Sequence, residues 1–366
     1  MRENMTTAII LGTRPEIIKL SPVIRECKQN NLDFFILHTG QHYSYEMDRV
    51  FFEQLRLPDA KYNLDIGSGP HAEQTGKMLI EIGKVLMEER PGIVLVQGDT
   101  NTVLAGALAA SKMGVMVGHV EAGLRSYDRR MPEETNRVLA DHCSDWLFAP
   151  TQTSMDTLLN EGIDEDKIFV TGNTIVDAVC QNLEIAKERS GIMDELGLEE
   201  KGYLLATAHR QENVDDPVRL GGILKGLKIV GEEFGVDVIF PVHPRTRKRI
   251  WEFGLGVDEC VRLIDPVDFM GFLSLESNAR LLLTDSGGVQ EEACIIGVPC
   301  VTLRDSTERP ETVEVGANVV AGVEAERIVE CARSMLERSD DGWVNPFGDG
   351  KAGGRIRGVL GMWDGE

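Results

Sequence analysis

Short apolar runs rich in valine, isoleucine and leucine alternate with longer segments along this chain. Runs of this kind, bounded by turn residues, are typical of buried strands, and the segments between them have the length of helices. The alternation predicts an α/β fold in which crossover helices join the strands of parallel sheets. The clearest runs are Ala8–Leu11, Ile93–Val96, Val115–Val120, Tyr203–Ala208, Val238–Phe240 and Leu281–Thr284.

Each of these runs ends at glycines or at charged and polar residues. Ligands of an open parallel sheet bind in the crevice beyond the carboxyl ends of its strands. We therefore predict that the residues at the ends of the runs form an active site. In chain order they are Gly12-Thr13-Arg14, Gln97-Gly98-Asp99, Glu121, His209-Arg210, His243 and Asp285-Ser286-Gly287-Gly288.

The length of 366 residues and a hydrophobic share of 42% suit two domains, each with its own core. The first series of strands ends at Phe169-Val170, so we expect the domains to span 1–170 and 171–350. A last helix over 355–363 is expected to pack back on the first domain.

A formal net charge of −22 would repel nucleic acids and anionic membranes over most of the surface. The seven cysteines contain no Cys-x-x-Cys pair, and no cluster has metal-ligand spacing. No apolar stretch approaches the ~20 residues of a membrane span, and the first apolar run is too short for a signal peptide. We expect a cytoplasmic protein with no nucleic-acid, membrane or metal partner.

Two segments are candidate anion sites. The turn through Gly287 and Gly288 leads into a helix whose first N–H groups and dipole favour a diphosphate, and Glu292 offers a carboxylate to ribose hydroxyls. Arg14 and Lys19, at the start of another helix, form the second candidate. The alternatives are a helix whose acids only complement its dipole and, for Lys19, a solvated helix face.

Asp99, Glu121 and Glu133 are candidate general acids and bases. Asp99 and Glu121 end neighbouring strands, and carboxylates that share a partly dry cleft raise one another's pKa toward neutrality. Two alternatives remain open: Asp99 caps the next helix, and Glu133 is only an acid in a first helical turn.

His209 and His243 each follow a strand of the second domain, and with Arg210 and Arg245 they extend the anion site. Phe272 could stack on a base or belong to the core.

Two common cofactor motifs are missing. Gly67-Ser68-Gly69-Pro70-His71-Ala72 matches the dinucleotide pattern as a string, but no strong strand precedes it and Pro70 makes it a loop. There is no Gly-Lys-Ser/Thr phosphate loop. We therefore expect neither a nicotinamide cofactor nor ATP hydrolysis.

The ordered motifs of almost the whole chain resemble those of the non-hydrolysing UDP-N-acetylglucosamine 2-epimerases. The resemblance implies two Rossmann-like domains with parallel sheets in a GT-B arrangement, an active site in the interdomain cleft, and a homodimer. The motifs are Gly12-Thr13-Arg14-Pro15-Glu16 with Lys19, Thr39-Gly40-Gln41-His42, Gln97-Gly98-Asp99-Thr100, His119 to Arg125, Pro132 to Arg137, Asp285-Ser286-Gly287-Gly288 with Glu292, and Thr307 to Glu311.

The resemblance also implies a role for particular residues. UDP would contact Arg14, His243, Phe272, Ser286, Gly287, Gly288, Glu292 and Arg309. The sugar would meet Lys19, Asp99, Glu121, Glu133 and His209. Gln41 and His42 would bind a second UDP-N-acetylglucosamine that activates the enzyme.

The implied reaction is reversible C2 epimerisation of UDP-N-acetylglucosamine to UDP-N-acetylmannosamine, in surface polysaccharide biosynthesis. It would proceed without a cofactor, by anti elimination of UDP through 2-acetamidoglucal and re-addition. The chain departs from its relatives at Gln211, where many have arginine, and at Val267, where some place glutamine beside the uracil. A 2-epimerase of a UDP-2,3-diacetamido sugar, a GT-B glycosyltransferase and a non-catalytic nucleotide-sugar sensor are the other readings.

Overall fold

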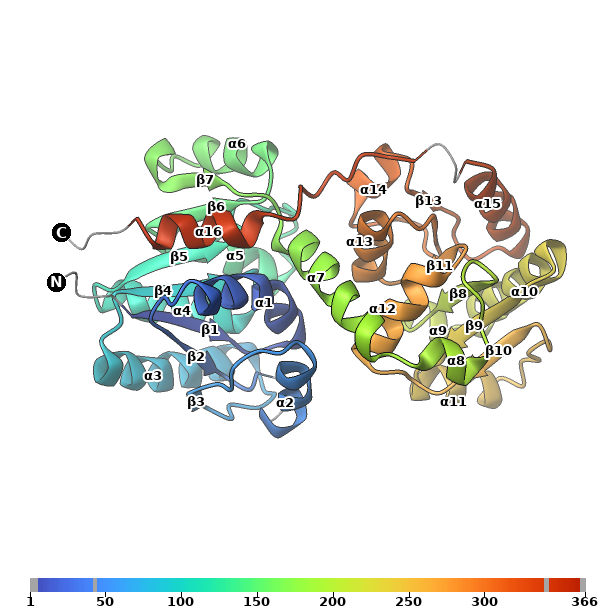
Figure 1. The fold of residues 1–366 in the computed structure, drawn as a ribbon, viewed down its shortest axis with the longest axis horizontal. Helices are drawn as coiled ribbons and strands as arrows, with labels where there is room; N and C mark the ends of the chain where they lie inside the picture. The colour runs from blue at the N-terminus through green and yellow to red at the C-terminus, as the bar shows by residue number, and fades with distance from the viewer. Residues whose placement is uncertain (1–5, 42–44, 339–341, 363–366) are drawn as a thin grey trace. The chain divides into compact units, whose positions relative to one another are not determined.

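The computed structural model describes residues 6–41, 45–338 and 342–362 (Figure 1). Contacts between Cα atoms divide the chain into two compact units. The first unit comprises Met1–Ala178 and Phe347–Glu366, and the second comprises Val179–Pro346. The division falls inside one helix, α7, a few residues after the boundary near residue 170 that the sequence suggested.

The first unit is built on a parallel sheet with the strand order β3-β2-β1-β4-β5-β6-β7 in its described residues. β1 and β4 are buried along their whole length, as expected of strands covered on both faces. The strands are β1 (Thr7–Leu11), β2 (Phe34–His38), β3 (Tyr62–Asn63), β4 (Ile93–Gln97), β5 (Met116–Val120), β6 (Trp146–Ala149) and β7 (Ile168–Val170).

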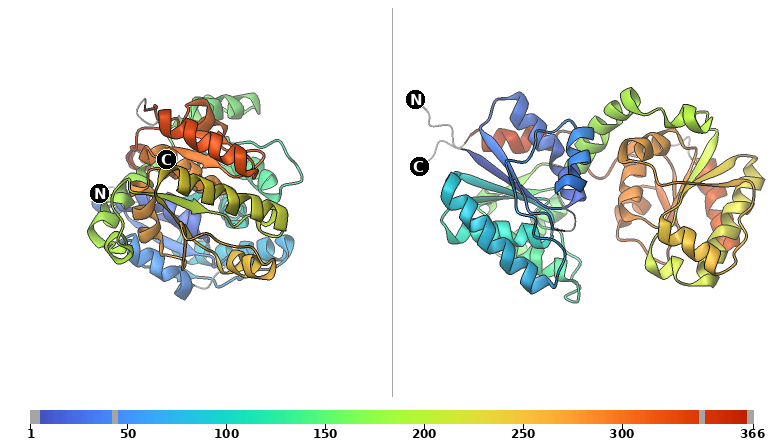
Figure 2. Two further views of the ribbon diagram at one scale, coloured as in Figure 1. Left: turned by 90° about the vertical axis from the view of Figure 1, so that its right-hand side faces the viewer. Right: turned by 90° about the horizontal axis from the view of Figure 1, so that it is seen from below.

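Helices cover both faces of this sheet (Figure 2). On one face α3, α4 and α5 pack side by side, and on the other α1 packs against α16. The helices are α1 (Arg14–Gln29), α2 (Tyr45–Gln54), α3 (His71–Glu89), α4 (Asn101–Lys112), α5 (Pro132–Cys143), α6 (Gln152–Asn160), the 3₁₀ turn η1 (Glu165–Lys167) and α16 (Ala352–Leu360). α7 (Thr174–Arg189) begins in this unit and continues into the second.

The second unit contains a parallel sheet with the order β10-β9-β8-β11-β12-β13. Its strands are β8 (Tyr203–Thr207), β9 (Asp237–Pro241), β10 (Val261–Ile264), β11 (Leu282–Thr284), β12 (Cys300–Thr302) and β13 (Asn318–Val320). Its helices are α8 (Ile192–Leu196), α9 (Gln211–Val214), α10 (Pro217–Phe234), α11 (Pro244–Glu252), α12 (Phe269–Asn278), α13 (Gly287–Ile296), α14 (Pro310–Glu314) and α15 (Ala325–Arg338).

The predicted fold class of two Rossmann-like α/β units is confirmed by these two sheets. In each sheet the direction of strand addition reverses once, between β1 and β4 and between β8 and β11. Crevices form at such switch points, beyond the carboxyl ends of the strands. The segments after these four strands begin at Gly12, Gly98, Ala208 and Asp285.

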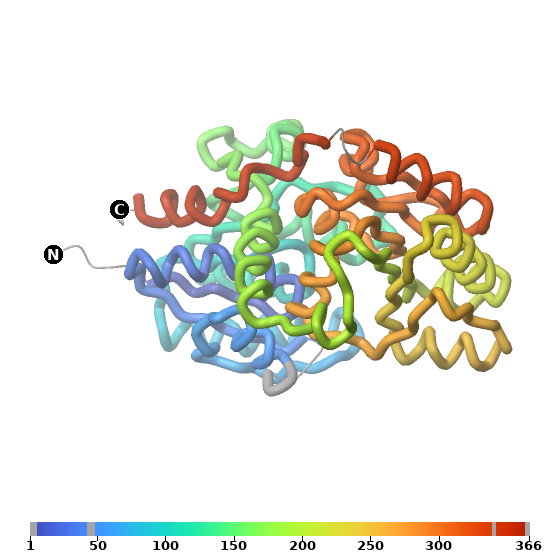
Figure 3. The backbone as a smooth tube through the Cα atoms, turned by 45° about the vertical axis from the view of Figure 1, so that its right-hand side comes forward, coloured from blue at the N-terminus to red at the C-terminus, as the bar shows by residue number. Residues whose placement is uncertain are grey.

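The C-terminal helix α16 packs against α1 within the first unit, and the two lie side by side in Figure 3. The helix begins at Ala352 and ends at Leu360, not at 355 and 363 as expected, and Trp363 lies outside the described residues. Asp177 explains the early start, because its carboxylate accepts the N–H groups of Ala352 and Gly353 at 3.1 and 2.9 Å. A Cβ on Gly353 would come within 3.1 Å of Pro22, so glycine permits the close packing.

None of the helices in the described residues is long and apolar enough to cross a membrane. In the same residues no three His, Cys, Asp or Glu side chains group as metal ligands would.

Candidate functional site

Glu121 follows β5 in a backbone conformation that few residues other than glycine adopt. Its φ is +70°, and that of Gly98, at the end of the adjacent strand β4, is +86°. A left-handed conformation costs a residue with a side chain about 1–3 kcal/mol and persists where the surroundings hold it. The N–H groups of Glu121 and Ala122 both donate to the carbonyl of Phe148, which holds this turn in place.

The carboxylate of Glu121 is held on both oxygens. Lys19 Nζ donates to Oε1 at 2.6 Å, and the side-chain amide of Gln97 donates to Oε2. Lys19 of α1 therefore meets an acid at the end of β5. Arg14, at the start of the same helix, places its Nε 3.1 Å from Oδ1 of Asp48 and its guanidinium 4.8 Å from the ring centre of Phe51.

Asp99 is oriented by α5. Its Oδ2 accepts from Nη2 of Arg137 at 2.5 Å, and its carbonyl accepts from Nδ2 of Asn136 at 2.9 Å. The N-cap of α4 is Thr100, whose hydroxyl accepts from the N–H of Val103. The alternative reading of Asp99 as the helix cap is therefore wrong.

Glu133 and Glu134 open α5 side by side but differ in their contacts. Glu134 is buried and accepts from the N–H and hydroxyl of Ser126 and the N–H of Tyr127, each at 2.9 Å, and from Arg137 at 2.8 Å. Burial opposes these contacts, yet they hold the pKa of Glu134 below its ordinary value. Glu133 is half-buried, and no described residue hydrogen-bonds or ion-pairs with it. Its carboxylate is available to a ligand.

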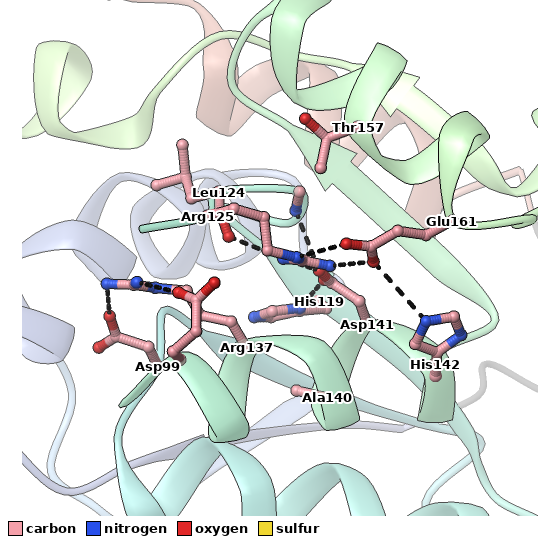
Figure 4. A network of polar contacts seen from close by, with 12 residues as sticks. Asp99, His119, Leu124, Arg125, Arg137, Ala140, Asp141, His142, Thr157 and Glu161 are labelled. Carbon is pink, nitrogen blue, oxygen red and sulfur yellow. Dashed lines mark hydrogen bonds and ion pairs between the residues drawn. The ribbon is translucent and has the colours of Figure 1, made fainter. Parts of the chain in front are cut away.

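A buried network behind the acids centres on His119 and Asp141 (Figure 4). Nδ1 of His119 lies 2.6 Å from Oδ1 of Asp141, and Nε2 lies 2.8 Å from the carbonyl of Gly98. Both partners are acceptors, so a ring with two N–H groups satisfies both. Burial alone would lower the pKa of His119, but Asp141 and these hydrogen bonds raise it above its ordinary value.

Arg125 completes the network. It lies 2.7 Å from Oδ2 of Asp141 and pairs with Glu161 at 2.6 Å. Because His119 holds the carbonyl of Gly98, the network fixes the turn that carries Asp99. His119 lies in one of the sequence motifs, but no role was predicted for it. Its position two residues before Glu121 could have indicated that it lies near the site.

Glu16 is a second residue whose role the sequence analysis missed. It is buried, and it accepts the N–H groups of Gly12 and Thr13 at 2.7 and 2.8 Å and the hydroxyl of Thr100. Burial raises its pKa to about 7, against the effect of these hydrogen bonds. Glu16 thus joins the turns that follow β1 and β4, the two strands at the switch point.

Gln41 is part of the packing behind these turns. Its Oε1 accepts from the N–H and the hydroxyl of Thr102 at 3.0 and 2.8 Å. His42, the other residue expected at an activator site, lies outside the described residues.

In the second unit, α13 begins with unpaired donors. Ser286 is its N-cap but makes no side-chain capping bond. In the described part of the chain, the N–H groups of Gly287, Gly288 and Val289 have no acceptor. Together with the helix dipole, these N–H groups can bind a phosphate.

Asp285 organises the residues beside α13. Its buried carboxylate accepts from the N–H groups of His209 and Arg210 at 3.0 and 2.9 Å and from the amide of Asn213 at 3.1 Å. Despite burial, His209 and these donors keep the pKa of Asp285 below its ordinary value. Nδ1 of His209 lies 3.1 Å from Asp285, and its side chain is 48% exposed. Asp285 was predicted from the sequence as one of the strand-end residues of the site, but without a role of its own.

His243 caps α11. Its Nδ1 accepts from the N–H of Arg245 at 3.2 Å, so a neutral ring carries its proton on Nε2 and can donate there. The neighbouring arginines are already paired: Arg245 contacts Asp215, and Arg210 lies 3.5 Å from Glu308.

Three other predicted residues lie on or near α12 and α13. Phe272 of α12 is half-buried and packs against the apolar core of the second unit. Nε of Arg309 lies 2.7 Å from Oε1 of Glu291. Glu292 is half-buried on α13.

Comparison with known proteins identifies one family for this chain. Residues 25–361 match the family model described as UDP-N-acetylglucosamine 2-epimerase. The UDP-N-acetylglucosamine 2-epimerase of Methanocaldococcus jannaschii is 57% identical over 362 residues, which cover 97% of this chain and 99% of that protein. The UDP-2,3-diacetamido-2,3-dideoxy-D-glucuronate 2-epimerase of Pseudomonas aeruginosa is 45% identical over 96% of this chain and 98% of its own.

Solved structures agree with the sequences. A structure of the M. jannaschii UDP-GlcNAc 2-epimerase superposes with a TM-score of 0.90 at 55% identity, covering 98% of this chain and all of that one. Another structure of that enzyme, in complex with UDP-GlcNAc and UDP, gives a TM-score of 0.83 at 57% identity with the same coverage.

Proposed function

Because the chain belongs to the UDP-N-acetylglucosamine 2-epimerase family of isomerases, we propose that it interconverts UDP-N-acetylglucosamine and UDP-N-acetylmannosamine. One observation in the first unit carries the proposal. Glu121 and Asp99 end adjacent strands, Lys19 holds Glu121, and Arg137 links Asp99 to the helix turn that bears the unengaged Glu133. These oriented carboxylates can take up and release protons.

The proposed reaction needs acids on a sugar and an anion clamp on its leaving group. No carbonyl acidifies the hydrogen at C2, so its removal must be coupled to departure of UDP from C1. A base takes the proton, the C–H electron pair forms the C1=C2 double bond, and the C1–O bond breaks to release UDP. UDP then adds back to C1 of 2-acetamidoglucal while an acid protonates C2 from the other face.

We assign the proton transfers to Asp99, Glu121 and Glu133, with His209 acting near the sugar. The two faces of C2 need two different groups, which is why more than one carboxylate is required. The sugar returns to its original oxidation level, so the reaction has no need of a redox cofactor.

We assign UDP binding largely to the second unit. The free N–H groups of Gly287 and Gly288, with Ser286, would hold the diphosphate, and Nε2–H of His243 would donate to it. Arg14 and Arg309 would add positive charge. Glu292 would accept the ribose hydroxyls, and Phe272 would stack on the uracil.

The expected homodimer remains part of the proposal. Large apolar side chains are exposed on α3, on α5 and directly after α4: Ile80 and Met87 at 62% each, with Leu139 at 45% and Met113 at 38%. Burying them against a second copy would remove apolar surface from water. Light scattering of the purified protein should give the mass of a dimer; the mass of a monomer would reject it.

A second candidate is 2-epimerisation of a UDP-2,3-diacetamido sugar. It is favoured by the 45% identity with the P. aeruginosa enzyme that carries this name. Incubating the protein with a panel of UDP-sugars, without acceptor or nicotinamide, distinguishes the candidate functions. We expect UDP-N-acetylmannosamine to form from UDP-N-acetylglucosamine. Conversion of the diacetamido sugar alone would favour the second candidate. Turnover that needs an acceptor would indicate a glycosyltransferase, and binding without turnover a sensor.

A further inference from the structure

Glu276 of α12 is a buried acid that the proposed reaction does not use. Its side chain is 0% exposed, and neither carboxyl oxygen receives a hydrogen bond from an N–H or hydroxyl group of the described residues. Within the same residues it forms no ion pair. An ionised carboxylate in such a place would carry a large desolvation cost. Glu276 is therefore expected to keep its proton.

Within the described residues, the carboxyl of Glu276 is hydrogen-bonded to the carboxyl of Glu292 on the neighbouring helix α13. Two carboxyls can hydrogen-bond only when one of them carries a proton. Burial, with the charge of Glu292 and the hydrogen bond to it, raises the pKa of Glu276 well above its ordinary value. Burial raises the pKa of Glu292 to about 7, while the hydrogen bond from Glu276 acts to lower it. Glu276 is fully buried whereas Glu292 is partly exposed, so the proton stays on Glu276, which is the donor, and Glu292 is the acceptor.

Among the residues that the structure describes, no cationic side chain interacts with this pair. Tyr203 of β8 and Cys300 of β12 face Glu276, and burial raises the pKa of both, so both are neutral near pH 7. Cys294 of α13 also has its pKa raised by burial, to about 12. Glu291 is the other nearby acid on α13, and it pairs with Arg309 at 2.7 Å. The proton that the two carboxyls share therefore keeps them from both being charged.

We propose that Glu276 is a positioning residue for nucleotide recognition: its protonated carboxyl donates a hydrogen bond to the carboxylate of Glu292 and so orients that carboxylate toward the two ribose hydroxyls of UDP. This inference rests on the proposed role of Glu292 in binding UDP. Glu276 itself touches no substrate.

Two substitutions of similar size separate this role from simple packing. In Glu276→Gln the amide can still donate to Glu292, so UDP affinity at pH 7 should stay within about twofold of the wild type. Glu276→Met fills the space without a donor, and UDP should bind about tenfold more weakly. Calorimetric titration with UDP measures both. Equal affinity of the Met variant and the wild type would overturn the proposal.

A deoxynucleotide shows whether the effect reaches the ribose. The ratio of UDP affinity to 2′-deoxy-UDP affinity reports the hydroxyl contact, and it should be smaller in Glu276→Met than in the wild type or in Glu276→Gln. A general loosening of the unit would weaken both ligands by the same factor and leave the ratio unchanged. An unchanged ratio contradicts the proposal.

If the wild type binds no UDP at all, the proposed function fails, whereas normal UDP binding by both the wild type and Glu276→Met rejects the role of Glu276 alone.

Discussion

Lys19 of α1 and Glu121 after β5 are 102 positions apart in the sequence, yet Nζ of Lys19 donates a 2.6 Å hydrogen bond to Oε1 of Glu121. Both side chains are largely buried, at 15% and 9% exposure. A charge-assisted hydrogen bond in such a site fixes the carboxylate in one orientation. The pair connects the helix that starts the first unit to the strand end that carries the proposed chemistry.

Replacing Lys19 with methionine should therefore impair turnover more than binding. We expect kcat to fall about 10²-fold for Lys19→Met, because Glu121 loses its orientation and its counter-charge, while UDP affinity changes by less than about threefold. The matched control is Lys28→Met, an exposed lysine in the last turn of the same helix. Wild-type turnover in Lys19→Met would show that the ion pair is only structural.

Amide substitution of the three carboxylates should lower turnover without unfolding the protein. Asp99→Asn, Glu121→Gln and Glu133→Gln keep the shape but remove the titratable group, and each should lower kcat by about 10²-fold or more. Since Thr100 caps α4, Asp99→Asn should melt close to the wild type. A variant with normal turnover removes its residue from the proton-transfer assignment.

Truncation of Glu292 should mainly affect nucleotide binding. Glu292→Ala leaves the ribose hydroxyls without an acceptor, so UDP should bind about 2 kcal/mol more weakly by calorimetry. Glu330→Ala, on the exposed surface of α15 in the same unit, is the control and should bind UDP normally. If Glu292→Ala binds UDP as the wild type does, its assignment to the ribose is wrong.

The His119–Asp141 pair should contribute to stability in a pH-dependent way. Asp141→Asn leaves His119 and Arg125 without their shared carboxylate, so we expect a loss of about 3 kcal/mol in the free energy of unfolding by denaturant titration. Glu184→Gln, which removes an exposed ion pair with Lys187, should change it by less than about 0.5 kcal/mol.

The directions of the two pKa shifts determine the pH range over which the His119–Asp141 pair stabilises the fold. The pKa of His119 is raised, so its contribution is complete below its unfolded pKa and is lost as pH rises through the folded value. The pKa of Asp141 is lowered, so its contribution is present above its unfolded pKa and is lost as pH falls through the folded value. The difference between wild type and Asp141→Asn should be largest between about pH 4 and 6.5. If the difference in the free energy of unfolding does not vary with pH, His119 and Asp141 do not form an ion pair.

The strand ends were predictable because they follow from local pattern. A buried run stops where polar residues begin, and parallel topology places those residues at one edge, so Asp99, Glu121, His209 and Ser286 could be picked from the sequence. Their partners could not. Asp141 and Glu16 belong to helices, and Asp285 follows a different strand from the one that precedes His209. Only the packed fold shows that these carboxylates accept hydrogen bonds from His119, Thr100 and His209.

For two arginines the local sequence predicted a binding role but did not show the carboxylates with which they pair. Arg210 directly follows His209 and Arg245 lies two residues after His243, and this closeness in sequence alone predicted an anion site. In the fold each contacts a carboxylate, Glu308 and Asp215 respectively, that lies 98 and 30 positions away. The local sequence does not show which distant carboxylate will pair with a given arginine.

The proposed reaction removes a proton from C2 of the sugar and returns one to it, and deuterium exchange reports both steps. UDP-N-acetylglucosamine is incubated with the protein in deuterated water, and the recovered nucleotide sugars are examined by proton NMR. The account predicts loss of the C2 proton signal in both UDP-N-acetylglucosamine and UDP-N-acetylmannosamine, and much slower loss with Glu121→Gln. Epimerised product that still carries its original C2 proton would contradict the proposed elimination and re-addition.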